Sequence, residues 1–467
     1  MRRWKSVLWT FAAFCVAIVG DTSAKSQETA APAQWYRGMI HMHSYWSDGQ
    51  ALPEEALALY KEGGCDFLVL SDHNRFQDNP DQWVEVGKKV KPEILAAFEA
   101  RFGADAIERK KVTDDQGEKT LVRLKTFDEL KALMEKDGDF LLIPGYEHSG
   151  DAKNGEHVHL NAIGTRRYVP LLQPETSEEM LKQNVEALDQ MLATERADGG
   201  ESLSFTMLNH PDWRYYDVLP EELIPYSTVR FFEIRNCGPT WKMKDGCWTC
   251  DTFWDVVNAY RALENAPLVY GVASDDTHGY GKMRENPQTG PGGWIVVKAP
   301  ELTQTAILQA MNDGNFYAST GVVLDDVTYD PQTKTNTLTI TPRVGETLTV
   351  RIFATSKTFD QTKETVEIAA DGDQPARTLF TYSDEIGREA GTVVVTVEEN
   401  QSRCDANTTG MEKLHTFLKD GTCTITWRGL PDDLYTRAMI ESGEPQPVKH
   451  GGKPDRQTAW TQPRPAM

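Results

Sequence analysis

Short apolar runs alternate with helix-like segments between about residue 35 and residue 320. The runs are rich in Val, Ile, Leu and Phe, and the segments between them include "LPEEALALYKEGG" and "TFDELKALMEKDG". Pro53 and Glu54 should open the first of these helices and Gly63 should close it, because proline favours the first helical position and glycine the end. The alternation predicts an α/β domain over residues 35–324.

The pattern changes after residue 324. The runs "NTLTITPRV", "TLTVRIFAT", "GTVVVTVEE" and "TCTITWRG" are rich in Thr and Val and alternate with period two between turn residues. They predict a smaller antiparallel β-sandwich over residues 325–440. Residues 441–467 contain many Pro and Gly residues, and we expect them to form an extended C-terminal tail over the surface.

Residues 75–125 form a longer connection than one strand-to-strand link requires. Their charged, Ala-containing stretch "KPEILAAFEARFGADAIERKK" favours a helical insertion over the mouth of the α/β domain. A lid is one role that such an insertion could have.

The first residues resemble a targeting sequence. Arg2, Arg3 and Lys5 precede a short apolar run, which predicts a signal peptide over residues 1–24 and then a polar linker over residues 25–34. An uncleaved anchor is the alternative, but the run is short for a membrane span of about 20 apolar residues. We expect a periplasmic or secreted protein with no stable membrane span once the signal is removed.

Charge narrows the classes of partner. The formal net charge is −21, whereas a nucleic-acid-binding face must be basic to release counterions. We therefore expect no nucleic-acid partner and consider small-molecule or glycan-linked ester substrates. The sequence does not indicate an oligomeric state.

Export would permit disulfides. Cys404 and Cys423 bracket one late segment and are predicted to pair, which would stabilise the fold by roughly 3 kcal/mol through chain entropy. Cys237, Cys247 and Cys250 form a cluster in which a disulfide is favoured over a zinc site, without indicating which two pair. Cys65 precedes the apolar run "DFLVL" and is predicted to be a buried free thiol.

Eight of the ten histidines lie between positions 41 and 278, and most of them sit where apolar runs end, as in "GMIHMH", "DFLVLSDH" and "FTMLNH". In a β/α barrel the carboxyl ends of the strands converge on one mouth. His41 and His43 are two residues apart, so on a strand both point to the same side. Carboxylates complete the set, and imidazole mixed with carboxylate suits Zn, Mn or Fe. The pattern predicts a multinuclear metal site.

Taken together, "HMHSYWSDG", "LSDHN", "GYEHSG", "HLNAIG", "NHPDW" and "ASDDTHG" resemble the polymerase-and-histidinol-phosphatase (PHP) superfamily of metallohydrolases over about residues 35–325. The resemblance implies a distorted (β/α)7 TIM-like barrel. The late stretches "GWIVVKAPELTQTAILQAMNDGNFYASTGVVL" and "AWTQP" are similar to an exported branch with a C-terminal β-domain, to which carbaryl-hydrolase-like metallohydrolases belong.

The resemblance also implies a set of ligands for two or three divalent metal ions. Glu147 would bridge two of the ions and, with Asp276, is assigned the catalytic role. His148 should point away from the site, His157 is a nearby or supporting residue, and Asp275 either supports the ligands or caps a turn. The implied first group is His41, His43, Glu147 and Asp276, the second is Asp48, His73 and His278, and the third is Glu147, His159 and His210.

Metal ions at such a site would generate hydroxide from a bound water near neutral pH. The expected function is therefore metal-dependent hydrolysis, in the first place of phosphate esters. Arg75 and Arg214 follow two of the motifs and Arg235 lies in "FEIRN". All three are candidates for binding the substrate, and Trp213 and Tyr215 could wall its pocket. The alternatives are a carboxylic-ester or carbamate hydrolase of the carbaryl-hydrolase type and a non-catalytic polysaccharide-binding envelope protein.

Overall fold

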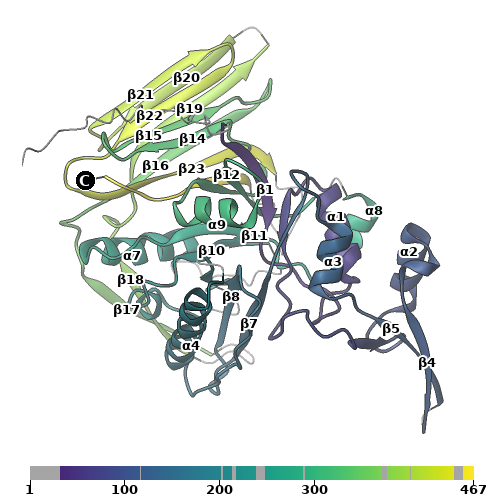
Figure 1. Cartoon of the computed structure of the whole chain (residues 1–467). Helices are drawn as coiled ribbons and strands as arrows, with labels where there is room; N and C mark the ends of the chain where they lie inside the picture. The colour runs from purple at the N-terminus through teal and green to yellow at the C-terminus, as the bar shows by residue number, and fades with distance from the viewer. Residues whose placement is uncertain are drawn as a thin grey trace, which may run out of the picture. The chain divides into compact units, whose positions relative to one another are not determined.

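The computed structural model describes residues 32–115, 117–200, 203–212, 217–237, 248–287, 290–370, 376–399, 401–445 and 456–466. The predicted signal peptide lies outside these residues, as do Arg214, Trp213, Tyr215 and Cys247. The described part from residue 33 onward is one compact unit. It mixes helices with several sheets (Figure 1), so the α/β class is as predicted.

Several helices begin where the sequence provides a proline or a capping threonine. Pro53 occupies the first turn of α1, which ends at Gly63 as predicted. Thr126 caps α3 through a capping box with Glu129, and threonine side chains accept hydrogen bonds from the first turns of α4, α7 and α9 as well. The helices are α1 (Pro53–Glu62), α2 (Pro92–Phe102), α3 (Phe127–Met134), α4 (Ser177–Ala197), α6 (Pro220–Leu223), α7 (Cys250–Leu263), α8 (Gly281–Glu285) and α9 (Gln304–Asn312).

The largest sheet contains strands from both predicted domains. Its order is β20-β19-β16-β23-β24-β13-β12-β1-β2-β6, and β25 pairs with β23. The bounds are β20 (Gln401–Thr408), β19 (Arg388–Glu398), β16 (Thr347–Ser356), β23 (Asp433–Pro445), β24 (Arg456–Thr461), β13 (Phe316–Ser319), β12 (Trp294–Ala299), β1 (Gln34–Met39), β2 (Phe67–Val69), β6 (Leu141–Ile143) and β25 (Arg464–Pro465).

A second sheet has the order β11-β10-β9-β8-β7. β9, β10 and β11 are parallel neighbours, whereas β8 is antiparallel to both β7 and β9. Isolated bridges connect Met42 with Thr277 and His73 with Glu147, and so link the two sheets. The seven-stranded barrel stays a prediction. The bounds are β7 (Gly145–Asp151), β8 (His157–Ile163), β9 (Phe205–Leu208), β10 (Phe231–Asn236) and β11 (Tyr270–Ser274).

The residues from 325 to 445, called the C-terminal β region below, form strands where period-two alternation predicted them. Apolar side chains of its four-stranded sheet share one buried cluster with those of β16, β19 and β23. Cys404 and Cys423 form the predicted disulfide, which joins β20 to β22. The remaining strands of this region are β14 (Asp326–Asp330), β15 (Thr335–Ile340), β22 (Thr422–Arg428), β21 (Lys413–Lys419), β17 (Lys363–Ile368) and β18 (Arg377–Tyr382).

The insertion at 75–125 is not purely helical, which corrects the prediction. One helix, α2, is accompanied by a three-stranded antiparallel sheet, in which residues 109–114 pair with residues 117–122 and Gly117 adopts a positive φ of 111° that glycine tolerates. Val90 of the insertion packs with Tyr45 and Trp46, so the insertion rests on the loop that follows β1. Its elements are β3 (Trp83–Glu85), η1 (Ala104–Ala106), β4 (Arg109–Asp114) and β5 (Gly117–Arg123).

The end of the chain is extended, as predicted, but it does not lie over the surface throughout. β24 is inserted between β13 and β23, and Ala459 and Thr461 are buried. The side chain of Gln462 also bonds both backbone groups of Gly271. The surface prediction was wrong here, because the backbone of this polar segment completes a sheet.

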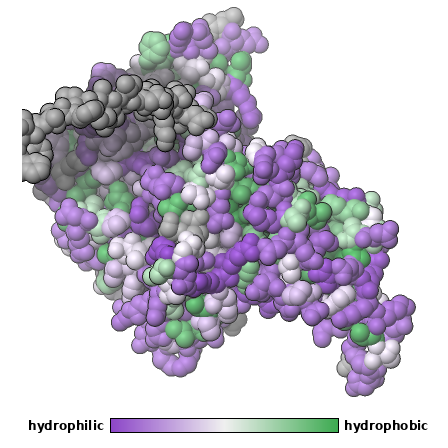
Figure 2. Space-filling model, in the orientation of Figure 1, coloured by the Kyte–Doolittle hydropathy of each residue, from purple (hydrophilic) through white to green (hydrophobic). Residues whose placement is uncertain are grey.

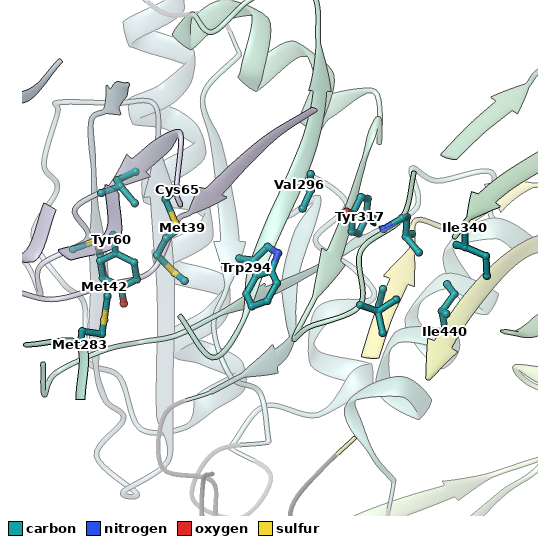
Figure 3. Packing of buried hydrophobic residues seen from close by; sticks show 14 of the residues in the cluster. Met39, Met42, Tyr60, Cys65, Met283, Trp294, Val296, Tyr317, Ile340 and Ile440 are labelled. Carbon is teal, nitrogen blue, oxygen red and sulfur yellow. Dashed lines mark hydrogen bonds between the residues drawn. The ribbon is translucent and has the colours of Figure 1, made fainter. Parts of the chain in front are cut away.

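One buried apolar cluster runs from α1 and β1 through β12 and β13 into the C-terminal β region. Figure 3 shows Met39 and Tyr60 in the part of this cluster near the first strands, Trp294 in its middle, and Ile340 and Ile440 in the β region. The two predicted domains therefore share packed core residues. The predicted boundaries between them stay a prediction.

The face of the molecule in Figure 2 is mostly hydrophilic, with small scattered hydrophobic areas. Among the described helices, none combines the length and the apolar content that crossing a membrane would require.

Two of the cysteine predictions have different outcomes. Cys65 is a buried free thiol, as predicted, and burial raises its pKa to about 12. Cys237 and Cys250 are also free thiols, so the disulfide expected in this cluster is not formed by either of them. The two cysteines lie on different elements. Cys237 follows β10 and lies against Gly292 and Gly293, whereas Cys250 is the first residue of α7.

Candidate metal centre

All nine side chains that the sequence analysis assigned to metal binding come together. They lie within or just after strands β1, β2, β7, β8, β9 and β11, so the convergence of strand ends brings them to one place. They form three neighbouring groups, of which two share His43, and within each group the possible ligand atoms lie within 4.8 Å of one another. The groups are His41, His43 and Asp276; His43, Asp48, His73 and His278; and Glu147, His159 and His210.

The first group surrounds the carboxylate of Asp276. Its Oδ1 atom lies 2.9 Å from Nε2 of His43 and 3.2 Å from Nε2 of His41. His41 Nε2 is also 3.3 Å from Oε1 of Glu147. His41 and His43 are both fully buried, so their position two residues apart after β1 directs both rings inward, as predicted.

The second group is more open to solvent. Oδ1 of Asp48 lies 3.2 Å from Nε2 of His278 and 3.4 Å from Nε2 of His73. The rings of His73 and His278 stack on His43, each with a centroid distance of 4.2 Å. The Asp48 side chain is 61% exposed, so this group faces the solvent side of the centre.

Glu147 connects the groups. Its Oε1 atom is 3.2 Å from Nδ1 of His159 and 3.8 Å from Nε2 of His210, while its Oε2 atom is 2.5 Å from Nδ1 of His73. The glutamate is fully buried. It is therefore the carboxylate that reaches imidazoles from all three groups.

The two buried carboxylates are ionised. Burial alone would raise the pKa of Glu147, but the imidazoles of His73, His159 and His41 hold that pKa well below its usual value. Burial likewise acts against ionisation of Asp276, and His41 and His43 lower its pKa nonetheless. The centre therefore offers negative charge at its middle.

The imidazoles differ in charge. Burial lowers the pKa of His43 to about 4, so this ring is neutral at neutral pH, which is the form that binds metals. Burial acts in the same direction on His278, but Asp48 and Asp276 outweigh it and raise its pKa to about 9. A cation in the second group would replace the proton on His278.

Glu233, a buried residue that the sequence analysis missed, contacts two of the histidines, one through its ring and one through its backbone. Its Oε1 atom is 2.7 Å from Nδ1 of His41, and its Oε2 atom accepts a hydrogen bond of 2.8 Å from the backbone N–H of His210. The first contact directs Nε2 of His41 toward the centre. The signal was a single Glu in the apolar run "VRFFEIRN".

Two further buried residues hold the centre in place. Asn209 donates from Nδ2 to Oε1 of Glu147 over 2.7 Å and to Oδ1 of Asn161 over 3.0 Å. Asp72 accepts hydrogen bonds from the backbone N–H groups of Ser44 and Ser47, and so fixes the loop that carries Asp48. Neither residue was assigned a role from the sequence.

The predicted arginines are less well placed. Arg75 is exposed two residues after His73. Arg235 is partly buried, and its charge acts on Cys237 and Cys250. Arg214 lies outside the described residues. A role for these side chains in binding substrate stays a prediction.

Three residues next to the possible metal ligands have contacts that indicate their roles. His148 points away from the centre, as predicted, and its Nε2 atom is 2.6 Å from Oδ1 of Asn184 on α4. Asp275 accepts hydrogen bonds from Tyr60, Thr277 and the backbone of Gly292, so it ties loops together. His157 forms an ion pair with Asp151 and lies beside His159.

No protein-family model and no curated protein matches the chain. Solved structures similar to it include a two-domain protein from Bacteroides vulgatus that contains a predicted PHP-like metal-dependent phosphoesterase. That structure is 14% identical, covers 92% of this chain and 95% of its own, and has a TM-score of 0.37.

Two further solved structures cover 52% of this chain and 88% of their own. One is a proposed metal-dependent phosphoesterase from Bifidobacterium adolescentis, at 12% identity and a TM-score of 0.28. The other is an amidohydrolase from Chromobacterium violaceum with bound sulfate and no metal, at 13% identity and a TM-score of 0.25. PHP-like metal-dependent phosphoesterases are thus among the similar structures, as the motifs suggested. At these scores they assign no activity to this chain, and its function is inferred from the centre.

Proposed function

We propose that this chain is a metal-dependent hydrolase of the PHP type that cleaves phosphate esters at the centre described above. The observation that carries the proposal is that one buried carboxylate, Glu147, contacts an imidazole from each of three neighbouring groups of possible ligands. A buried carboxylate that reaches all three groups is suited to bridging two cations. Two or three divalent ions such as Zn, Mn or Fe match this mixture of ligands.

The residues present fit such ions. Nε2 of His41 is buried and forms no hydrogen bond with any described residue, although carboxylate oxygens lie 3.2 and 3.3 Å away. A cation between the nitrogen and the oxygens would satisfy all of them. Bound ions would lower the pKa of a water molecule and neutralise charge on the attacked group.

The protein's own contribution is to hold the ligands ready. Glu233 fixes the ring of His41, Asn209 orients Glu147, and the hydroxyl of Ser149 lies 2.6 Å from Nδ1 of His73. Fixed ligands avoid reorganisation when the substrate arrives. The backbone of Asp276 has a positive φ of 47°, a conformation that tends to occur at functional sites.

Two positively charged side chains near the centre, Lys89 and Arg75, favour an anionic substrate. Lys89 lies in the turn of the insertion between Glu85 and Val90, where its backbone N–H bonds the carbonyl of Glu85. Partial desolvation and the charge of Arg75 lower the pKa of Lys89, whereas the carboxylates of Asp72 and Asp48 act in the opposite direction. Both side chains bring positive charge to the side of the second group, and positive charge there attracts an anionic substrate. This supports a phosphate ester over a neutral ester.

The proposal also includes the architecture, the location and the substrate class that the sequence predicted. We infer a seven-stranded barrel joined to a β-sandwich, export to the periplasm or medium, and a small-molecule or glycan-linked ester as substrate. The disulfide between Cys404 and Cys423 supports export.

The test is a panel of substrates with metal analysis of the same purified protein. The full chain, loaded with Zn, Mn or Fe, should hydrolyse para-nitrophenyl phosphate or bis-para-nitrophenyl phosphate and should hold at least two ions. Turnover of naphthyl esters alone would favour the carboxylic-ester alternative. Polysaccharide binding without any bound metal would overturn the proposal.

A further inference from the structure

A row of polar side chains leads outward from the metal centre along one face of the β7–β8 pair. The register places Glu147 opposite Asn161, Ser149 opposite His159, and Asp151 opposite His157. Successive residues of a strand point to opposite faces, so these six side chains share one face. The other face carries the apolar residues and His148, which contacts α4.

The outer end of this row repeats the chemistry of the centre. Asp151 and His157 form an ion pair, and ligand atoms of Asp151, His157 and His159 all lie within 4.8 Å of one another. The rings of His157 and His159 are 6.1 Å apart and nearly perpendicular. His157 is buried, whereas the Asp151 side chain is 56% exposed. The group is therefore built on fixed strands and is open to solvent at one end.

We propose that Asp151, His157 and His159 hold a further divalent cation at the outer edge of the metal centre. Two imidazoles and one carboxylate suit a borderline cation such as Zn, Mn or Fe, and they leave coordination positions open for water or a substrate oxygen. The inference extends the proposed metal centre and rests on it.

The edge cation should bind more weakly than the inner ions. His159 belongs to both the edge group and the group of Glu147, so a filled inner position leaves the edge cation dependent chiefly on Asp151 and His157. Fewer protein ligands and an exposed carboxylate both reduce affinity. The edge cation is expected as a separate, weaker class of bound ion.

A titration of the metal-free full chain with Mn²⁺ tests this, with free and bound ions counted by electron paramagnetic resonance. Wild type should bind its inner ions first and then one weaker ion. Asp151→Ala, a change at an exposed side chain, should lose that weaker ion and keep the inner ions. His157→Gln should do the same. His148→Asn, on the opposite face of β7, should titrate like wild type.

The outcomes separate this inference from the proposed function. If Asp151→Ala and His157→Gln bind as many ions as wild type at every concentration, the ion pair is only a hydrogen-bonded contact and the edge site does not exist. Loss of an inner ion in either variant would also contradict it, because the group would then serve the inner centre. Wild type that binds no ion at all would overturn the proposed function itself.

Discussion

The metal centre and the C-terminal β region differ in the kind of side chain that they bury and in what this burial does to stability. In the centre, His41, His43 and Glu147 are ionisable and fully buried. In the β region, side chains such as Leu338 and Ile425 are apolar and fully buried. Apolar burial stabilises by about 25 cal/mol per Å², whereas buried ionisable groups cost free energy unless partners satisfy them. The β region thus supports the fold, and the centre is arranged for chemistry at a cost to stability.

Among changes that leave the possible metal ligands in place, Glu233→Gln in the metal centre is expected to have the largest effect on metal affinity. Glu233→Gln keeps the shape but weakens the contact with Nδ1 of His41. Metal affinity should fall about 10–100-fold, as it does when residues behind metal-bound histidines are changed. Titration against a metal buffer measures this, with Glu222→Gln as a control at a remote acid. An unchanged affinity would remove Glu233 from the centre.

The disulfide tests whether the C-terminal β region stabilises the fold. Replacing both Cys404 and Cys423 by serine frees a loop with a sequence separation of 19 residues. The free energy of unfolding should decrease by about 3 kcal/mol on chain-entropy grounds. Denaturant unfolding measures the loss, and metal analysis of the same variant should show an unchanged number of ions. Lost ions would show that the two regions are coupled rather than separate.

A smaller effect is expected where the insertion approaches the centre. Lys89→Ala should raise KM for a phosphate ester about fivefold, the change that about 1 kcal/mol produces, and should leave kcat unchanged because the charge acts on binding. Lys88→Ala, next to it and also exposed, is the control. Steady-state kinetics at low salt measures both variants. A lower kcat in Lys89→Ala, or the same KM change in Lys88→Ala, would contradict this role of Lys89.

The smallest effect concerns a carboxyl outside the centre. Burial raises the pKa of Glu222 from 4.5 to about 7, and its carboxylate accepts hydrogen bonds from Leu219 and Ser177. Between these two pH values the folded state keeps a proton that the unfolded state has lost, so stability falls as pH rises through this window. Thermal unfolding of Glu222→Gln should depend less on pH there. An identical profile for both proteins would refute the assignment.

Most of the centre could be predicted because its residues sit where the chain pattern changes. His41, His73 and His210 follow apolar runs, and the rule that strand ends converge placed them together. Glu233 was missed because its partner His41 is 192 residues away, and a single Glu within an apolar strand does not indicate what it faces. Only the packed structure shows that pairing.

The fold was predictable where local signals were strong. The caps at Pro53 and Gly63 and the alternation in the C-terminal β region gave the right elements. The insertion was misjudged because β4 and β5 are mostly polar and show no clear alternation, so that Gly117 was a weak signal of the hairpin. Burial of β24 could not be predicted, because its residues are mostly polar and it is held by pairing with β13, which is distant in sequence, and with β23, which ends before the undescribed residues 446–455.

The central claim is that Glu147 joins cations, and two neighbouring residues on opposite faces of β7 test it most directly. Glu147→Gln keeps the shape but removes the charge that reaches His73 and His159. His148→Asn changes a ring that contacts Asn184 away from the centre. Metal content and turnover of the two variants should be measured side by side after reconstitution with the same ion.

Glu147→Gln should bind at least about one ion fewer than wild type and should lose roughly 10²-fold or more in turnover. His148→Asn should keep its ions and most of its activity. Equal losses in the two variants, or full metal content and activity in Glu147→Gln, would contradict the assignment of this cluster as a metal centre.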